Sequence, residues 1–220
     1  MVDLGFQSGL ERPGNVIRLN LMKVELIAIT PEPERIIEIA ARTCYQSGDK
    51  MVPEKLGELL PKLIAMGHES PFEHAYATFK VNDVSRAMTH QLVRHRLLAV
   101  SQKSQRYVSE GNFDWVMPPS VKADGKAEFD RDMEVIRGMY KKWKDKGLKN
   151  EDARFVLPNA CTTEMIISAN FREWRHVFHV RCHRRAQWEI RDVCLAMLKE
   201  LNQQAPHVFA DLAKEFLAAE

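Results

Sequence analysis

The sequence predicts an α+β fold: a single domain in which a small antiparallel sheet packs against several helices. Helical periodicities clearly outnumber strand-like stretches, and the strands do not alternate regularly with helices as they would in a parallel sheet. A chain of 220 residues fits one domain or at most two small ones, and 45% hydrophobic residues can form a substantial core.

Residues 1–21 show no clear periodicity, and we expect a flexible N-terminal extension followed by one domain over residues 22–220. Met22 opens an apolar stretch typical of a first strand. Thr30-Pro31 resembles a helix N-cap followed by proline at the first helical position. Residues 56–66 predict a second helix, restarted or kinked at Pro61 and ended by Gly67.

The next segment predicts a half-buried strand followed by a helix. Apolar and polar residues alternate over 75–81, Asn82-Asp83 offers a cap, and a helix is expected from about Val84. Positions three and four apart on a helix are neighbours. Three polar side chains should therefore share one side of it: Gln91, Arg94 and His95.

The second half of the chain is mainly helical. A loop over 111–125 precedes a long amphipathic helix that stops at Gly147. Its large apolar side chains are expected in the core: Phe129, Met133, Ile136, Tyr140 and Trp143. Asn150 should cap a short helix, 163–169 predicts a strand, Asn170 should start the next helix, and two further helices complete the chain.

The charge distribution favours a small anionic ligand over a long nucleic acid. The formal net charge is only +2, which is weak for a nucleic-acid-binding domain. Residues 170–191, however, contain six arginines against Glu173 and Glu189. A local cationic surface of this kind suits a small anion, although a solvated helix face accounts for the charge alone equally well.

The cysteines and the hydropathy pattern predict a cytoplasmic location. The four cysteines show no CxxC pairing and no small secreted scaffold, so reduced thiols are expected. No apolar run approaches the length of a membrane span, and the N-terminus lacks the apolar segment of a signal peptide.

Two nearby segments have the groups expected of a phosphate site. One is the basic stretch Arg94-His95-Arg96, and the other is the polar, hydroxyl-bearing loop Ser104-Gln105-Arg106. Guanidinium groups bind phosphate through paired, charge-assisted hydrogen bonds. A basic helix C-terminus stabilised by the macrodipole, by less than about 1 kcal/mol, is the simpler explanation of the first cluster. Ser104 lacks a nucleophile elbow and a base within its loop, which favours a hydrogen-bonding hydroxyl over a nucleophile.

Other ligand motifs are weak or missing. His68 and His74 lie six residues apart with Pro71 between them, which does not fit a helical zinc motif. His176, His179 and Cys182 have helical spacing, but the nearby arginines repel a cation, so no metal is predicted. Neither a P-loop nor a Gly-x-Gly-x-x-Gly motif occurs, so arginines and polar side chains would have to hold any nucleotide phosphate.

Several motifs together resemble the flavin-dependent thymidylate synthases. Arg94-His95-Arg96, seven further residues and Ser104 match the family's Arg-His-Arg-x7-Ser signature. Residues 67–74 (Gly-His-Glu-Ser-Pro-Phe-Glu-His) and 153–158 (Ala-Arg-Phe-Val-Leu-Pro) match two more blocks. Asn170-x-Arg172, Arg181 and Ala186-Gln187-x-Glu189-Ile190 follow in the family's order, so the resemblance extends from residue 22 to the C-terminus.

The resemblance implies the family's fold, a single catalytic α+β domain, and its reaction. The family converts dUMP to dTMP with methylenetetrahydrofolate as one-carbon donor and NADPH as reductant through FAD, without a covalent enzyme nucleophile. It implies a homotetramer with sites at subunit interfaces, and neither nucleic acid nor a membrane as partner.

The family's site residues carry over by position. The expected FAD ligands are Ser70, Glu73, Arg94, His95, Arg96, Gln102, Asn170, Arg172 and His176. The expected dUMP ligands are Gln91, Arg94, Gln102, Ser104, Gln105, Arg106, Arg154 and Arg181. The resemblance places His68 beside the flavin and folate rings as a catalytic residue, together with Arg181, whose charge would stabilise the pyrimidine as its C5 becomes nucleophilic. Some relatives have Glu at position 102, Asn at 176 and His at 185.

Two alternatives from other classes remain open. The arginine-rich helices could bind RNA or DNA, which requires an affinity that falls steeply with salt. His176, His179 and Cys182 could serve a metal-dependent hydrolase, which requires stoichiometric metal.

Overall fold

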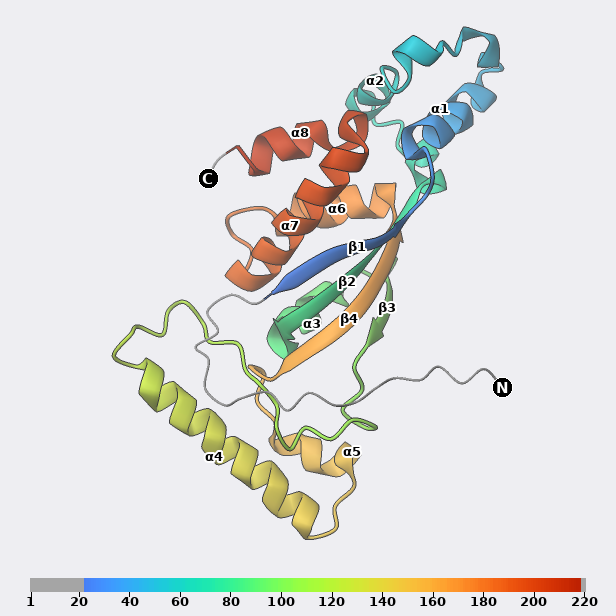
Figure 1. Cartoon of the computed structure of the whole chain (residues 1–220). Coiled ribbons are helices and arrows are strands. Elements are labelled where there is room, and N and C mark those ends of the chain that lie inside the picture. Colours follow the sequence, from blue (N-terminus) through green and yellow to red (C-terminus); the bar gives the residue numbers. More distant parts are fainter. Residues whose placement is uncertain (1–21, 219–220) are drawn as a thin grey trace, which may run out of the picture.

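A four-stranded antiparallel sheet lies at the centre of the computed structural model (Figure 1), which describes residues 22–218. Its strands are β1 (Lys23–Ile29), β2 (Tyr76–Ser85), β3 (Ala99–Gln102) and β4 (Thr162–Asn170), in the order β1-β2-β4-β3. The α+β fold with a small antiparallel sheet is confirmed. The N-terminal extension predicted over residues 1–21 lies outside the described residues.

All of the α-helices except α3 form three groups around this sheet, and α3 lies against the sheet itself (Figure 1). The α-helices are α1 (Pro33–Cys44), α2 (Leu60–Ala65), α3 (Arg86–Leu92), α4 (Lys126–Asp145), α5 (Asn150–Ala153), α6 (Phe171–Arg181), α7 (Trp188–Gln204) and α8 (Pro206–Phe216). Short 3-10 turns are η1 (Gly48–Lys50), η2 (Pro53–Lys55), η3 (Ser70–His74) and η4 (Arg154–Val156). In Figure 1, α6, α7 and α8 lie together beside the sheet, with α1 and α2 at one end and α4 and α5 at the other. Within residues 22–218, no helix is both long and apolar enough to span a bilayer.

The core forms where β2 and β4 pack against α6 and α7. Trp174 of α6 is fully buried and contacts two phenylalanine rings. The ring of Phe79, on the buried face of β2, lies 5.3 Å from it, and the ring of Phe178, one turn after Trp174 in α6, lies 5.8 Å from it, between centroids. The Trp174 indole N–H donates to the carbonyl of Ala77 over 3.1 Å, so its one polar atom is satisfied. Burying aromatic area on this scale fixes α6 against the sheet, and α6 carries several of the predicted site residues.

Two helix starts differ from the prediction, because other residues than the predicted ones cap the helices. The α1 helix begins at Pro33 rather than Pro31, since the Thr30 hydroxyl accepts a hydrogen bond from the Tyr76 backbone N–H (2.9 Å) at the edge of the sheet. β2 continues through Asn82-Asp83, with an irregular register between Val81 and Val84. Ser85 then caps α3 by accepting from the Met88 backbone N–H over 3.0 Å.

The structure differs from the sequence-based prediction at three further places in the middle of the chain. β3 was not predicted from the sequence; its four residues pair with β4. In α4 only Met133 and Tyr140 are buried, and Trp143 is 36% exposed, so the predicted burial of the whole apolar face is wrong for the single chain. Asn150 does not cap α5 but donates to the Tyr107 carbonyl over 3.4 Å.

Candidate functional site

The turn after α3 presents two exposed arginines, Arg94 and Arg96. Because α3 ends at Leu92, Arg94 and His95 lie in the following turn, which corrects the prediction that they share a helical face with Gln91. The side chains of Arg94 and Arg96 are exposed, and no acidic group among residues 22–218 forms an ion pair with either. Uncompensated guanidinium groups of this kind are suited to binding an anion.

A contact between His95 and Arg181 joins this turn to the last residue of α6. The Arg181 Nε–H donates to His95 Nε2 over 2.9 Å, and Arg181 Nη2 donates to the Gln91 carbonyl over 3.1 Å. His95 is 8% exposed, and its ring packs edge-on against the ring of His176, with centroids 5.6 Å apart. The structure therefore brings together four of the predicted site residues from two segments far apart in sequence: Gln91, His95, His176 and Arg181.

The protonation state of His95 follows from this environment. Burial, the Arg181 charge and then His176 lower the pKa of His95 to about 4. A neutral imidazole can accept at Nε2 and carry its proton on Nδ1, which faces the Glu173 carboxylate at 3.8 Å. Glu173 was not singled out from the sequence, because its acidic side chain also fits the ordinary preference for the first turn of a helix.

The loop after β3 holds a second group of predicted residues. Gln102 donates to the hydroxyls of Thr89 (3.1 Å) and Thr163 (3.3 Å), which fixes the end of β3 against α3 and β4. The Ser104 hydroxyl accepts from the Arg106 backbone N–H over 3.3 Å. Gln105 is 7% exposed and donates to the Cys161 thiol over 3.7 Å, so this side chain is buried beside Cys161.

Arg106 lies in that loop, and Arg86 and Arg154 from two other segments lie near it. Arg106 forms an ion pair with Glu151 (3.1 Å), and Arg154 donates to the Glu151 carbonyl over 3.2 Å. Arg86, in the first turn of α3, donates to the Lys103 carbonyl over 3.5 Å. Burial lowers the pKa of Arg86, and the Arg154 charge adds to that effect. Arg86 was not predicted, although a cation at a helix N-terminus opposes the macrodipole and could have drawn attention to it.

A third group lies at the opposite end of α6. Arg172, in its first turn, forms ion pairs with Glu73 (2.6 Å) and Glu69 (3.5 Å) of the segment around η3. Asn170 caps the helix by accepting from the Glu173 backbone N–H over 2.8 Å, as predicted. Ser70 lies in the same 3-10 turn, and His68 precedes it on the surface. No hydrogen bond or ion pair joins His68 to Arg181 within the described chain.

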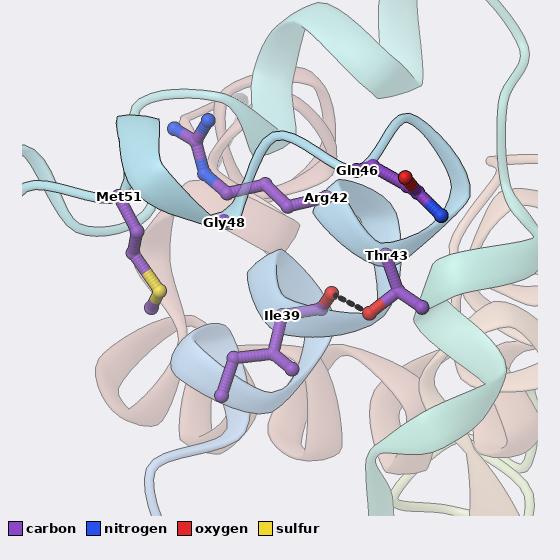
Figure 2. Close-up of a pocket in the computed structure, with 6 residues that line it drawn as sticks. All are labelled: Ile39, Arg42, Thr43, Gln46, Gly48 and Met51. Carbon is purple, nitrogen blue, oxygen red and sulfur yellow. Dashed lines mark hydrogen bonds between the residues drawn. The ribbon is translucent and has the colours of Figure 1, made fainter.

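A cavity of about 310 Å³ lies elsewhere, between α1 and η1 (Figure 2). Figure 2 shows its lining, in which the Thr43 hydroxyl donates to the Ile39 carbonyl over 2.8 Å. None of the predicted site residues lines it, and its arginine, Arg42, already forms an ion pair with Glu38 over 2.7 Å. The candidate site is therefore assigned from its side-chain chemistry and not from this cavity.

The possible metal cluster on α6 gains no support from its geometry. Cys182 is 3% exposed, and burial raises the pKa of its thiol to about 12, so it stays protonated at neutral pH. Among residues 22–218, no group of three or more His, Cys, Asp and Glu side chains is arranged to hold a metal ion.

Comparison with known proteins identifies the family. Residues 25–207 match the family model described as thymidylate synthase complementing protein. The chain belongs to the flavin-dependent thymidylate synthase family. The flavin-dependent thymidylate synthase of Geobacter sulfurreducens is 44% identical over 200 residues, covering 86% of each chain. That of Nitratidesulfovibrio vulgaris is 41% identical over 209 residues, covering 86% of this chain and 85% of its own.

A solved structure agrees in fold as well. The crystal structure of Thymidylate Synthase X from Helicobacter pylori with FAD and dUMP matches with a TM-score of 0.75 at 26% sequence identity. The match covers 88% of this chain and 100% of that chain. The family recognised from the Arg-His-Arg-x7-Ser signature is thus confirmed.

Proposed function

We propose that this flavin-dependent thymidylate synthase methylates dUMP to dTMP, with methylenetetrahydrofolate as one-carbon donor and NADPH as reductant through bound FAD. The observation that carries the proposal is the contact between Arg181 and a neutral His95, which follows the exposed Arg94 in the same turn. Family membership supports the ligands, since the Helicobacter pylori relative is described with FAD and dUMP.

The donor set fits a flavin dinucleotide. FAD carries two phosphates, and the exposed guanidinium groups of Arg94 and Arg96 can supply charge-assisted donors to them. Arg172 is already paired with Glu73, so a phosphate there would compete with that carboxylate. When bound, the flavin would relay reducing electrons from NADPH to the reaction. The remaining proposed FAD ligands are Ser70, Glu73, His95, Gln102, Asn170 and His176.

The loop after β3 is the proposed site of the dUMP phosphate and sugar. Ser104, Gln105, Arg106 and Arg154 offer hydroxyl, amide and guanidinium donors from neighbouring segments, and we add Arg86 to this group. Gln91, Arg94 and Gln102 complete the proposed substrate contacts. The electrostatic interaction between Arg86 and Arg154 supports the assignment, because two cations held near each other gain stability from an anion between them.

Arg181 is the proposed catalytic cation. As the uracil C5 becomes nucleophilic, negative charge develops on the pyrimidine, and a guanidinium held in place stabilises it without reorganising. Neutral His95 holds the Arg181 Nε–H, which leaves other N–H groups of the fork for the substrate. His68 is proposed to lie beside the flavin and folate rings.

Ser104 is proposed as a ligand and not as a covalent nucleophile. Its hydroxyl accepts from the Arg106 backbone N–H, and no histidine or carboxylate of the described chain hydrogen-bonds to it. A serine nucleophile needs a base within hydrogen-bonding distance to remove its proton.

We propose that the active enzyme is a cytoplasmic homotetramer whose catalytic domain spans residues 22–220, and that it uses neither nucleic acid nor a membrane as partner. Three large apolar side chains next to proposed ligands are strongly exposed in the single chain: Phe155 (85%), Tyr107 (79%) and Leu97 (74%). A neighbouring subunit would cover such side chains and bring separate groups of ligands together.

Absorption spectroscopy and product analysis test the proposal. Purified protein loaded with FAD should show oxidised-flavin bands that bleach with NADPH, and dTMP should form only when dUMP and methylenetetrahydrofolate are also present. Two results would contradict the proposal. One is a protein that does not bind FAD, and the other is a protein that binds oligonucleotides with a steep salt dependence and does not bind dUMP.

A further inference from the structure

The short helix α3 carries Gln91 and leads directly into Arg94 and His95. It has seven residues, about two turns, and an isolated helix of that length is not stable in water. Its orientation therefore depends on what holds its two ends. Both ends are held from the start of α7, by two side chains to which the proposed chemistry assigns no role: Glu189 and Gln187.

Glu189 holds the first end of α3 through the capping residue Ser85. One carboxylate oxygen accepts from the Ser85 backbone N–H (2.6 Å), and the other accepts from the Ser85 hydroxyl. The same hydroxyl accepts from the Met88 backbone N–H over 3.0 Å, so it caps the helix and contacts Glu189 at once. The carboxylate also lies at the positive end of the α3 macrodipole.

Glu189 lies in the first turn of α7, where an acidic residue is favoured, but that preference does not require it to be buried. It is only 5% exposed, and no arginine or lysine among residues 22–218 forms an ion pair with it. Burying a carboxylate is costly unless hydrogen bonds satisfy it. Within residues 22–218, the donors that reach this carboxylate both belong to Ser85, so its hydrogen bonds are made to the residue that caps α3.

Gln187 holds the other end of α3. Its side-chain oxygen accepts from the backbone N–H groups of Glu189 and Ile190 (both 3.1 Å), which caps α7, and from the Gln91 amide over 3.4 Å. The Gln91 carbonyl accepts in turn from Arg181 (3.1 Å). The helix is thereby connected to α7 at both ends and to the proposed catalytic cation at one.

We infer that Glu189 is a positioning residue, which together with Gln187 sets the register of α3 and so places Gln91 and Arg94 for dUMP. This inference rests on the proposed function. Without Glu189, Ser85 loses both of its contacts to α7, and the first end of α3 keeps only the backbone hydrogen bonds from Arg86 and Ala87 to the Cys161 and Asn159 carbonyls (both 3.0 Å) and its buried apolar face. We expect this weaker support to let α3 shift slightly relative to α6. A displacement of about 1 Å at a site that positions substrate can cost on the order of 100-fold in rate.

The test compares Glu189→Ala and Glu189→Gln with a control that removes another buried carboxylate. Glu38 on α1 is 1% exposed and accepts from Arg42 and from the Gly57 backbone N–H (both 2.8 Å), outside the proposed site. Each variant is loaded with FAD, and four quantities are measured: melting temperature, FAD content, Kd for dUMP and kcat.

Positioning predicts a pattern that loss of stability alone does not produce. Glu189→Ala should raise the Kd for dUMP by about 10-fold or more and lower kcat in the folded, FAD-loaded fraction. Glu189→Gln should have a Kd for dUMP and a kcat between those of Glu189→Ala and wild type, because the oxygen of its amide can still accept from the Ser85 N–H. Glu38→Ala should lower the melting temperature while its Kd for dUMP stays within about 2-fold of wild type.

Ser85→Ala is the second variant, in case Glu189→Ala does not fold. It keeps the Glu189 contact to the backbone and loses the hydroxyl bridge, so it should raise the Kd for dUMP by a smaller factor. Equal Kd values for wild type, Glu189→Gln and Ser85→Ala would overturn the inference. Wild-type protein that neither binds dUMP nor forms dTMP would instead overturn the proposed function.

Discussion

The Arg181→Ala substitution tests the catalytic assignment most directly. It removes the donors to His95 Nε2 (2.9 Å) and to the Gln91 carbonyl (3.1 Å), together with the charge proposed to face the pyrimidine. Removing one donor aimed at developing charge costs about 3–4 kcal/mol, or roughly 10²- to 10³-fold in kcat. FAD affinity should change little, because Arg94 and Arg96 remain.

The assay is steady-state dTMP formation by FAD-loaded enzyme at saturating substrate concentrations, which gives kcat, and flavin content is read from the visible spectrum. Arg184→Ala serves as the control, since Arg184 is exposed, lies three residues further on and carries the same charge. Arg181→Lys should restore only part of the rate, because lysine lacks the planar fork that reaches His95 and the substrate together. An FAD-loaded Arg181→Ala enzyme within about 3-fold of the wild-type kcat would refute the reasoning.

Three further predictions concern binding, acid stability and backbone conformation. Ser104→Ala should raise the Kd for dUMP by about 10- to 100-fold, as expected for one hydrogen bond to a charged group, while turnover persists at saturating dUMP; a folded variant with no turnover at all would favour a nucleophilic serine. The lowered pKa of His95 (about 4, against 6.5) means that the unfolded chain takes up the proton first, so stability should fall by up to roughly 3 kcal/mol between pH 6.5 and 4. Urea unfolding at several pH values measures that loss, and a His95→Gln variant with the same acid slope would contradict it. Gly57→Ala should destabilise the protein by about 1–3 kcal/mol, because φ is +85° and the new Cβ would lie 2.5 Å from the His207 ring; Gly138→Ala, with nothing within 4 Å, should instead stabilise α4 by about 0.5–1 kcal/mol in the same assay.

Much of the fold follows from local pattern. The alternation along β2 predicted its buried face, and Asn170 does cap α6, because period-2 burial and N-cap hydrogen bonds act within a few residues. Boundaries were wrong where a side chain made a distant contact instead. Thr30 was predicted to cap α1, but its hydroxyl is taken by Tyr76, 46 residues away.

The predicted burial of α4 was wrong because local pattern does not show what covers an apolar face. An amphipathic helix shows which side chains avoid water, but not whether the same chain or another one covers them. Met133 and Tyr140 are buried by the described chain, whereas Trp143 is not.

The sequence alone determined the family and the kinds of chemical group at the site, because the Arg-His-Arg-x7-Ser signature and its companion blocks are local patterns. Only the tertiary structure decided how those groups meet. It brought Arg181 to His95 across 86 residues, made that histidine neutral through burial and a neighbouring charge, and placed Glu189 under Ser85 across 104. Hydrogen bonds and desolvation act over a few ångströms in space, and the order of residues along the chain does not fix those distances.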